Sequence, residues 1–350
     1  MRIVGIDPGT GSFDFFGMDG DRIIIDASVA VPDVARNPRV LLETLRSLLP
    51  LDMIVGPSGY GLPVTSIEDM TERELNLMVP DDKSIPLYDG IRMVLRSMKT
   101  ECFPVWFTPG VIHLPTLPVY RKANKIDMGT ADKVCCVAVA MRDQVERTGI
   151  EYNQTSFILV EMGYAFTAVI AIENGSIVDA LGGTSGGPGF MTLGSMDAEL
   201  AVRMGKFPGI VLFSGGAKDM SGKTDLTPQE LVKERVAYSD AWNMLLESAV
   251  KGVAAMTAVV ERPREILISG RLTELPEITE ELKSRLSRYG TVRKVKRHTK
   301  VAKEAAEGAY IIGEGLSGGK YSALVESLAL KQASGTMYDY ILVKGVDISR

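Results

Sequence analysis

The sequence predicts an α/β protein built from two similar halves, because one pattern of strands and turns occurs twice. Residues 2–26 contain an apolar segment, a glycine-rich turn and two further apolar segments joined by a hairpin turn. Residues 157–180 have the same order. The first apolar segment ends in Asp7 in one copy and in Glu161, 154 residues later, in the other. Helices and strands alternate after each copy, so we expect two α/β domains that face one another, residues 1–150 and 151–350.

Composition excludes several classes of protein. The chain has 350 residues, 45% of them hydrophobic, which is enough for two domains with sizeable cores. The net charge of −5 gives no basic field that would attract nucleic acid or an anionic membrane. No apolar run reaches the ~18 residues that span a bilayer. The chain starts directly with a strand rather than a signal peptide, so we expect a cytoplasmic protein.

Cysteine and histidine are scarce. Three cysteines, two of them adjacent, do not make a disulfide framework, which fits a reducing cytoplasm. The two histidines are His113 and His298. With so few imidazoles, neither a histidine-rich metal site nor a Ser-His-Asp hydrolase is expected.

The turn after the first strand is a candidate phosphate site. Gly9 and Gly11 would let the backbone approach a phosphate closely, and its N–H groups could bind the anion. Thr10 and Ser12 add hydroxyl donors. Asp7, at the end of the strand, could hold Mg²⁺ through water, because Mg²⁺ keeps most of its hydration shell. Two such turns, one from each half, could hold a nucleotide triphosphate across a cleft. Ordinary glycine-rich hairpins are the alternative interpretation.

The rest of the first half alternates helices and strands. Asn37 and Pro38 mark a helix start, and leucines at helical spacing follow them. The loop at residues 56–63 leaves the end of a strand, where open α/β sheets bind ligands. Ser58 and Tyr60 could therefore donate hydrogen bonds to a substrate, and a plain flexible loop is an equal alternative. Further expected elements are strands at 51–55 and 103–108, helices within 66–99, a loop at 109–125, and a helix from Ala131 to about Val145 in which Asp132 occupies the first turn.

The second half continues after its hairpin with five glycines in nine residues, 181–189. This loop could lie against phosphates or a substrate, and an ordinary linker is the alternative. Gly270 follows an apolar strand, and Arg271 could stack on a nucleotide base or be a simple surface arginine. The basic residues 291–298 suggest a nucleic-acid patch or, more simply, a solvated edge strand. Further expected elements are helices at 196–204, 239–260, 276–288 and 301–312, a helix that starts near Pro228, short strands at 210–213 and 265–269, and a C-terminal helix.

Three segments together resemble a known superfamily. Asp7-x-Gly9-Thr10-x-Ser12 resembles the phosphate-1 motif of the acetate and sugar kinase, Hsp70 and actin (ASKHA) superfamily. The segment from Glu161 through Gly163 to Thr167 resembles its phosphate-2 motif, and residues 266–270 resemble its adenosine motif. The match in order and spacing covers nearly the whole chain. Within the superfamily, the sequence is most similar to an uncharacterised archaeal family that is predicted to be butyrate-kinase-like.

The sequence also departs from the superfamily pattern. The phosphate-2 motif usually starts with Asp, and here Glu161 takes that place. The adenosine motif usually has two glycines, and here Arg271 takes the second. The His-containing Gly-Asn-Gly stretch of acetate kinases has no clear counterpart. These departures affect the identity of the substrate more than the fold.

The resemblance implies a fold and a set of site residues. The fold would be two ribonuclease-H-like, actin-like ATPase domains that face a nucleotide cleft. The cofactors would be ATP and Mg²⁺, with Asp7 and Glu161 near the metal. Asp132, Asp127 or Asp7 would carry catalysis, and Ser58, Tyr60 and Arg121 are substrate candidates. The implied nucleotide-binding residues are Gly9, Thr10, Gly11, Ser12, Glu161, Gly163, Tyr164, Thr167, Gly182, Gly183, Thr184, Gly270 and Arg271.

The function implied by the resemblance is ATP-dependent phosphoryl transfer to a small acceptor, such as a short-chain carboxylate. The alternative is a nucleotide-binding ATPase switch, or a non-catalytic scaffold, of the same superfamily. The expected partners are a nucleotide and a small-molecule acceptor, with a second copy of the chain as a further candidate. Neither a membrane nor a nucleic acid is supported as a partner.

Overall fold

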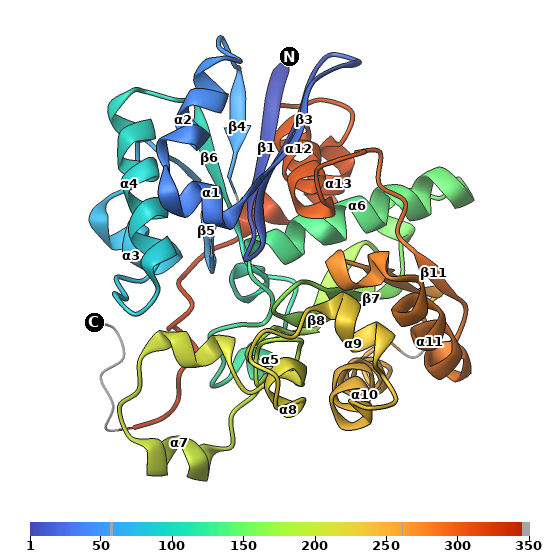
Figure 1. Cartoon of the computed structure of the whole chain (residues 1–350). Helices are drawn as coiled ribbons and strands as arrows, with labels where there is room; N and C mark the ends of the chain where they lie inside the picture. The colour runs from blue at the N-terminus through green and yellow to red at the C-terminus, as the bar shows by residue number, and fades with distance from the viewer. Residues whose placement is uncertain (57–58, 261, 345–350) are drawn as a thin grey trace. The chain divides into compact units, whose positions relative to one another are not determined.

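The structure, a computed structural model, describes residues 1–56, 59–260 and 262–344 (Figure 1). The chain forms two compact units. The expected boundary near residue 150 lies close to the change of unit at Asn153. The expected division differs from the structure at the C-terminal end, because residues from Lys296 onward pack with the first unit. Unit 1 comprises residues 1–126, 130–153 and 296–350, and unit 2 comprises residues 127–129 and 154–295.

The sheet of unit 1 has six strands in the order β3-β2-β1-β4-β6-β5. The first three strands form an antiparallel meander, and β1, β4 and β6 run parallel to one another. The carboxyl ends of β1, β4 and β6 therefore meet at one edge of the sheet. The strands are β1 (Arg2–Pro8), β2 (Ser12–Asp19), β3 (Arg22–Ala30), β4 (Met53–Val55), β5 (Gly61–Ser66) and β6 (Val105–Pro109).

Helices cover both faces of this sheet (Figure 1). Helices α1–α4 pack on one face, where Leu41, Leu42 and Leu45 of α2 join the core. Helix α12 packs on the other face, against β1 and α6. The helices of unit 1 are α1 (Val31–Arg36), α2 (Arg39–Arg46), α3 (Glu72–Met78), α4 (Pro86–Thr100), α5 (Val119–Lys122), α6 (Ala131–Thr148), α12 (Glu304–Leu316) and α13 (Ser322–Ser327).

Small residues explain how α12 joins unit 1. A Cβ atom on Gly308 would collide with the carbonyl oxygen of Cys135 in α6, and one on Gly5 of β1 would collide with the carbonyl oxygen of Ala306. The expected domain division, with residues 151–350 in the second domain, put this helix in that domain. The close contacts with β1 and α6 place it in unit 1 instead.

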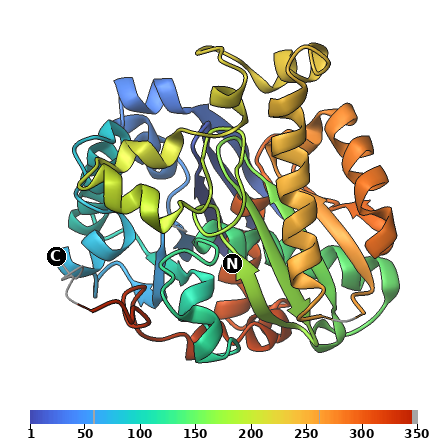
Figure 2. The ribbon, with the colours of Figure 1, turned by 90° about the horizontal axis from the view of Figure 1, so that it is seen from below.

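The sheet of unit 2 has five strands in the order β11-β10-β7-β8-β9. Figure 2 shows the long helix α10 running along this sheet. Its buried side chains, which include Leu245, Leu246 and Ala249, pack with Ile158 and Val160 of β7. The strands are β7 (Phe157–Met162), β8 (Thr167–Glu173), β9 (Ser176–Leu181), β10 (Glu265–Ser269) and β11 (Val292–Lys294). The helices are α7 (Ala198–Met204), α8 (Ala217–Met220), α9 (Pro228–Lys233), α10 (Ser239–Met256) and α11 (Pro276–Leu286), with 3₁₀ turns η3 (Gly209–Phe213) and η4 (Arg271–Glu274).

The two meanders have the same register. Asp7 pairs with Asp14 across β1 and β2, and Glu161 pairs with Ala168 across β7 and β8. An irregularity follows Gly17 in unit 1 and Ala171 in unit 2, again 154 residues apart. In the sequence, the glycines of the second hairpin turns, Gly20 and Gly175, are 155 residues apart. The backbone instead aligns Gly20 with Asn174, both with positive φ, so the spacing stays at 154 throughout.

Some expected elements differ from the structure. Residues 210–213 form the 3₁₀ turn η3, not a strand, and none of its residues is buried. Residues 61–63, expected as the end of the loop at 56–63, belong to β5, because pairing with β6 outweighs their glycine and proline content. The basic strand expected at 291–298 is limited to β11. Among the described residues, no helix combines the length and apolar character that a membrane span requires.

Candidate functional site

The turn between β1 and β2 is tight. The N–H group of Gly9 donates to the carbonyl oxygen of Ser12 at 3.0 Å. A Cβ atom added to Gly9 would lie 3.0 Å from that oxygen and 3.6 Å from Oδ2 of Asp7. Thr10, at the tip, is exposed, and the carbonyl oxygen of Gly11 accepts from the N–H of Val31 at 3.2 Å. The glycine-rich turn predicted from the sequence is therefore anchored at its base and open at its tip.

Asp7 ends β1 as a buried carboxylate. Burial is the main cause that raises its pKa to about 8, followed by the charges of Asp132 and Asp14, while Lys303 and Lys133 act in the opposite direction. No residue that the structure describes forms an ion pair or a side-chain hydrogen bond with Asp7. A buried carboxylate without a cation fits the single protein ligand of a largely hydrated Mg²⁺. Groups of three or more Cys, His, Asp or Glu suited to a metal do not occur within the described ranges.

Asp132 lies beside Asp7, in the first turn of α6. Its carboxylate accepts from the hydroxyl group of Thr130 and, at 2.7 Å, from Nζ of Lys133. Burial works to raise the pKa of Asp132, but the charge and hydrogen bonds of Lys133 and Thr130 outweigh it and hold the pKa below its ordinary value. The structure thus brings together Asp7 and Asp132, two carboxylates that the sequence analysis selected. Their surroundings shift the two pKa values in opposite directions, upward for Asp7 and downward for Asp132.

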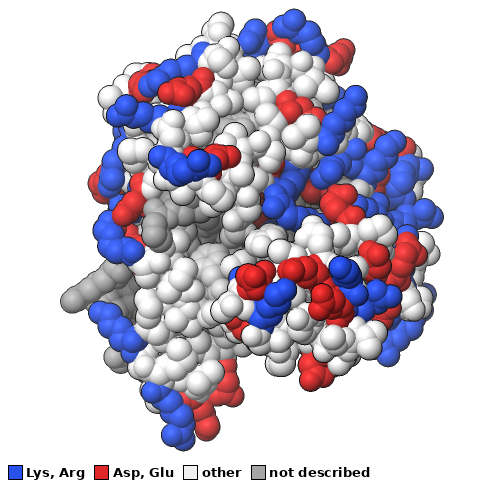
Figure 3. Space-filling view, viewed as in Figure 1, with Lys and Arg blue, Asp and Glu red and all other residues white. Residues whose placement is uncertain are grey.

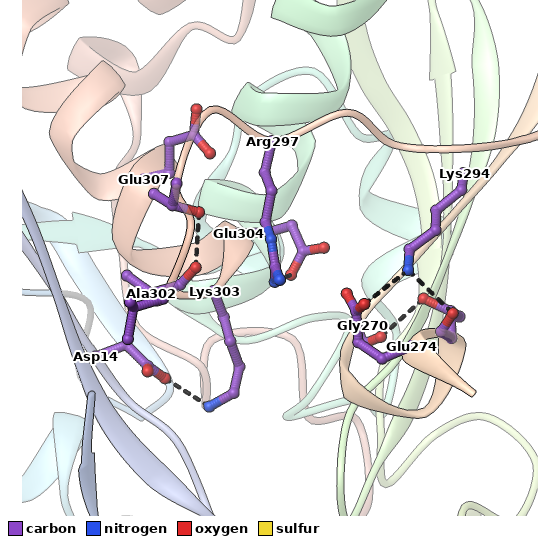
Figure 4. Close-up of polar contacts among 12 residues, drawn as sticks. Asp14, Gly270, Glu274, Lys294, Arg297, Ala302, Lys303, Glu304 and Glu307 are labelled. Atoms are coloured by element: carbon purple, nitrogen blue, oxygen red, sulfur yellow. Dashed lines mark hydrogen bonds and ion pairs between the residues drawn. The ribbon is translucent and has the colours of Figure 1, made fainter. Parts of the chain in front are cut away.

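Two further residues of this cluster were not predicted from the sequence. Asp14, on β2, is fully buried, and its Oδ2 accepts from the hydroxyl of Ser12 at 2.9 Å and from Nζ of Lys303 at 2.5 Å. Figure 4 shows the Lys303 side chain extending from the start of α12 to Asp14. The hairpin register could have revealed Asp14, seven residues after Asp7, but no local signal indicates Lys303, which is 289 residues away from Asp14.

The turn between β7 and β8 in unit 2 repeats this geometry. The N–H of Gly163 donates to the carbonyl oxygen of Phe166 at 2.9 Å. A Cβ atom on Gly163 would lie 3.2 Å from that oxygen and 3.5 Å from Oε1 of Glu161. The buried hydroxyls of Thr167 and Ser269 have no hydrogen-bond partner within the described parts of the chain. Buried hydroxyls of this kind favour a polar ligand or ordered water nearby. The sequence analysis selected Thr167 and missed Ser269.

Gly270 follows β10 and lies against the carboxylate of Glu161. Its φ of +93° is a conformation that other residues rarely adopt. A Cβ atom here would collide with the carbonyl oxygen of Met162 and lie 2.6 Å from Oε1 of Glu161. The guanidinium group of Arg271 lies 5.8 Å from the ring centroid of Tyr164, so these two predicted nucleotide contacts are neighbours.

Lys294 supports the turn that follows Gly270. Its Nζ donates to the carbonyl oxygen of Thr273 at 3.1 Å and forms an ion pair with Glu274 at 3.0 Å (Figure 4). The hydroxyl of Thr273 donates to the carbonyl oxygen of Gly270 at 2.8 Å. Hydrogen bonds from Lys294 and from the Thr273 hydroxyl therefore hold the backbone between Gly270 and Thr273 in place.

Asp127 holds the glycine-rich loop of unit 2. Its Oδ1 accepts from the N–H of Gly129 at 2.8 Å, and its Oδ2 accepts from the N–H and hydroxyl of Thr184 at 2.9 and 3.1 Å. A Cβ atom on Gly182 would collide with this carboxylate, and one on Gly183 would lie 2.6 Å from the ring of Phe166. The loop is closely packed rather than a flexible linker. Asp127, expected as a catalytic base, has both oxygens occupied by hydrogen bonds.

The structure gives little support for the residues that were predicted to contact the substrate. Ser58 lies outside the described residues. The N–H of Tyr60 donates to the carbonyl oxygen of Met78 at 3.4 Å. The guanidinium group of Arg121 lies 5.7 Å from the ring centroid of Tyr120, an exposed side chain. None of these contacts assigns a substrate role to Tyr60 or Arg121.

Four of the five basic side chains in the segment 291–298 contact a carboxylate. Each of these four contacts lies within one unit and offsets part of the positive charge of the segment. In Figure 3, Lys and Arg side chains gather towards the right of the view, with some Asp and Glu side chains among them. The contacts within the segment favour the solvated edge strand over the nucleic-acid interpretation. The pairs are Arg293–Glu265 (3.4 Å), Lys294–Glu274 (3.0 Å), Arg297–Glu304 (3.9 Å) and His298–Glu146 (3.1 Å).

Comparison with known proteins gives one family and a group of similar structures. The profile of a family described as "Protein of unknown function (DUF1464)" matches residues 5–343. No curated protein matches the sequence. Among solved structures, acetate kinase from Entamoeba histolytica is similar with a TM-score of 0.62 at 11% identity, over 83% of this chain and 87% of that chain. A propionate kinase from Francisella tularensis subsp. tularensis SCHU S4 is similar with a TM-score of 0.63 at 12% identity, over 87% and 98%. A ROK family protein from Streptococcus pneumoniae TIGR4, in complex with sucrose, gives 0.50 at 15%, over 90% and 100%.

At these identities the similarity shows the fold. The predicted fold class is confirmed: the protein is an α/β protein with two mixed sheets, and it matches the actin-like ATPase fold of acetate and ROK kinases. The resemblance that the sequence suggested is thus confirmed as a similarity of fold.

Proposed function

The chain belongs to the DUF1464 family, and we propose that it is an ATP-dependent phosphotransferase that uses Mg-ATP to phosphorylate a small acceptor, with short-chain carboxylates as the acceptor class. The fold is shared with acetate and propionate kinases. A shared fold does not by itself assign a reaction. The proposal therefore depends on the two turns and on the groups around them.

The observation that carries the proposal is the matched pair of turns. In each unit a glycine amide closes the turn, from Gly9 to Ser12 at 3.0 Å and from Gly163 to Phe166 at 2.9 Å. In each, a carboxylate at the end of the preceding strand lies against that glycine. Turns of this kind present backbone N–H groups to an anion, and the absence of a Cβ atom lets a phosphate approach. Each turn therefore suits a phosphate group.

Each unit would supply its own contacts. In unit 1, Asp7 would hold the hydrated Mg²⁺, and the backbone at Thr10 would bind phosphate. In unit 2, the turn from Gly163 to Thr167 would bind phosphate and Gly270 would contact the nucleoside, with Arg271 and Tyr164 beside the base. When bound, Mg²⁺ would offset phosphate charge.

The hydrogen bonds and charges around Asp127 and Asp132 support a carboxylate as the acceptor class. Asp127 has both oxygens occupied, and Asp132 is paired with Lys133 and has a lowered pKa, so neither is a strong general base. A hydroxyl acceptor would need such a base, whereas a carboxylate acceptor is already ionised at neutral pH. Lys133 could offset its charge as it approaches. This favours a carboxylate over a sugar.

A second candidate function is nucleotide binding without transfer, as in a switch or a scaffold. The weakness of Asp127 and Asp132 as bases also fits this alternative, because a scaffold needs no acceptor chemistry. ADP release from Mg-ATP, measured with and without acetate, propionate, butyrate or glucose, separates the two. The proposal predicts release that depends on a carboxylate and is at least tenfold lower with glucose. Binding of Mg-ATP with no acceptor-dependent release would favour the scaffold.

A further inference from the structure

We propose that Lys303 is a phosphate-binding residue of the turn at Thr10–Ser12, and that its ammonium group moves from Asp14 to the phosphate when a polyphosphate binds. The inference rests on the proposed function in taking the ligand to be a polyphosphate. It adds a residue that lies at the start of α12, far along the chain from the turn that it would serve.

The position of Lys303 is fixed independently of Asp14. The carboxylate of Asp26, on β3, accepts from the backbone N–H groups of Lys300 at 2.7 Å and of Ala302 at 2.7 Å. These contacts hold the segment that leads into α12 against the meander. Helix α12 is in turn packed against β1. The backbone of Lys303 therefore stays in place whether or not its side chain is paired with Asp14.

The hydrogen bonds around Ser12 determine which group can donate to a phosphate. The hydroxyl of Ser12 donates to Oδ2 of Asp14 at 2.9 Å, and Nζ of Lys303 donates to the Ser12 oxygen. A hydroxyl has one hydrogen to donate, so Ser12 has none left for a phosphate in this arrangement. An ammonium group has three, and Lys303 uses two of them on Ser12 and Asp14. Lys303 thus keeps a hydrogen that it can donate to a phosphate, whereas Ser12 does not.

Lys303 and Asp14, the two partners of the ion pair, also differ in their exposure to solvent. The side chain of Asp14 is 0% exposed, and that of Lys303 is 21% exposed. Moreover, Oδ1 of Asp14 is buried without a hydrogen-bond partner within the described residues. The ion pair with Lys303 therefore leaves one oxygen of the Asp14 carboxylate without a donor. The lysine lies at the boundary with solvent and can reach a ligand, whereas the carboxylate cannot. An incoming polyphosphate carries more negative charge than one carboxylate and would compete for the ammonium group.

The structural alternative is that Lys303 only neutralises the buried Asp14. Removing either partner of such a pair is costly, because it leaves an uncompensated buried charge or a lost contact. The alternative predicts that variants at the two positions lower stability and alter phosphate binding in the same direction. Our inference predicts opposite effects on binding, because Asp14 competes with the phosphate for Lys303.

The experiment compares Lys303→Met with Asp14→Asn by calorimetric titration of inorganic tripolyphosphate and, separately, of Mg-ATP into the full chain. Lys303→Met should bind tripolyphosphate at least about tenfold more weakly than wild type, the loss typical of a charged hydrogen bond. Asp14→Asn should bind it as tightly as wild type or more tightly. Lys303→Arg keeps the charge and should bind within a few-fold of wild type. Thermal unfolding checks each fold, and Lys303→Gln replaces Lys303→Met if the latter does not fold.

Three outcomes overturn the inference. The first is a wild type that does not bind tripolyphosphate. The second is unchanged binding in Lys303→Met, and the third is an equal loss in Asp14→Asn. If wild type binds Mg-ATP while Lys303→Met is unaffected, the proposed function stands and this inference fails. If tripolyphosphate binding depends on Lys303 but Mg-ATP does not bind, the inference stands and the proposed function fails.

Discussion

Asp7 lies directly opposite Asp14 in the antiparallel ladder of β1 and β2, and only Asp14 is paired with a cation. Residues opposite each other in a ladder share one face of the sheet, so the two carboxylates are close neighbours. Their mutual repulsion, added to burial, keeps Asp7 protonated into the neutral range. A cation that binds Asp7 must therefore displace a proton, and this links the candidate site to pH.

The first prediction is a loss of stability at higher pH that depends on Asp7. The pKa of Asp7 rises from its ordinary value of 3.8 to about 8 in the folded chain. A carboxyl group with a raised pKa stabilises the fold below its ordinary pKa, and this stabilisation is lost as pH rises towards the folded value. We expect the melting temperature of wild type to fall between pH 5 and pH 8. In Asp7→Asn the fall should be smaller by several degrees.

Thermal unfolding of the two proteins at several pH values, without nucleotide, tests this prediction. Asp52→Asn is a suitable control, because Asp52 is exposed. Parallel pH profiles for wild type and Asp7→Asn would mean that Asp7 ionises normally in the fold, and the physical account of the cluster would then be wrong.

The second prediction distinguishes two costs of replacing Gly270, the steric clash of a Cβ atom and the strain of a positive φ. Gly270 and Gly318 both have positive φ, at +93° and +83°. A Cβ atom would collide with the carbonyl of Met162 at the first position and meets nothing within 4 Å at the second. Gly318→Ala should cost about 1 kcal/mol, from strain alone. Gly270→Ala should cost about 2 kcal/mol more and should also weaken Mg-ATP binding.

Urea unfolding measures both losses of stability. Equal losses in the two variants would show that the backbone at Gly270 can move away from Glu161. An unaltered Mg-ATP affinity in a folded Gly270→Ala protein would remove Gly270 from the nucleotide site.

The third prediction concerns Asp127 as the residue that holds the glycine-rich loop. Asp127→Ala removes three hydrogen bonds to Gly129 and Thr184, so amide hydrogen exchange within residues 181–189 should become at least about tenfold faster. Thr184→Val removes only the hydroxyl contact and should give a smaller effect in the same segment. Hydrogen exchange with mass spectrometry measures both.

If Asp127 were instead a general base, Asp127→Asn would abolish turnover while protection in the loop stayed at the wild-type level. That result would restore the catalytic role that the sequence analysis gave to Asp127 and would exclude the structural one.

The fourth prediction tests the buried ion pair that links α6 and α12. The side chains of Arg142 and Glu307 are 2% and 1% exposed, whereas those of Lys251 and Glu247 are 75% and 56% exposed. Glu307→Gln would leave the buried Arg142 charge with only the half-exposed Glu146, 3.6 Å away, as an ion-pair partner, at a cost of about 3 kcal/mol. Glu247→Gln should cost less than about 1 kcal/mol. Chemical denaturation checks both, and similar losses would show that water or a rearranged partner compensates Arg142.

Much of the fold could be predicted from the sequence because its signals are local. The two meanders are marked by apolar alternation and turn residues within about 25 positions each. Asp7, Gly9, Glu161 and Gly163 could be selected for the same reason, since each lies at a fixed distance from its strand. Strand β5 could not be predicted, because its glycine and proline content favours a loop. Only pairing with β6 makes this segment a strand.

The parts that could not be predicted depend on contacts between distant segments. Lys303 joins the candidate site only because α12 packs back on β1, and no short-range pattern records that packing. From the sequence, Asp127 was a candidate catalytic carboxylate, and only the folded loop shows that its oxygens accept from Gly129 and Thr184. Local periodicity carries no information about such partners.

The most direct test of the account is a calorimetric titration of Mg-ATP into wild type and into Asp7→Asn at pH 8. The account predicts saturable binding to wild type, and binding at least about tenfold weaker in the variant, because an amide cannot replace the carboxylate that holds the hydrated cation. No saturable binding to folded wild type, or equal affinity in both proteins, would contradict the proposal that the turn after β1 is a metal–nucleotide site.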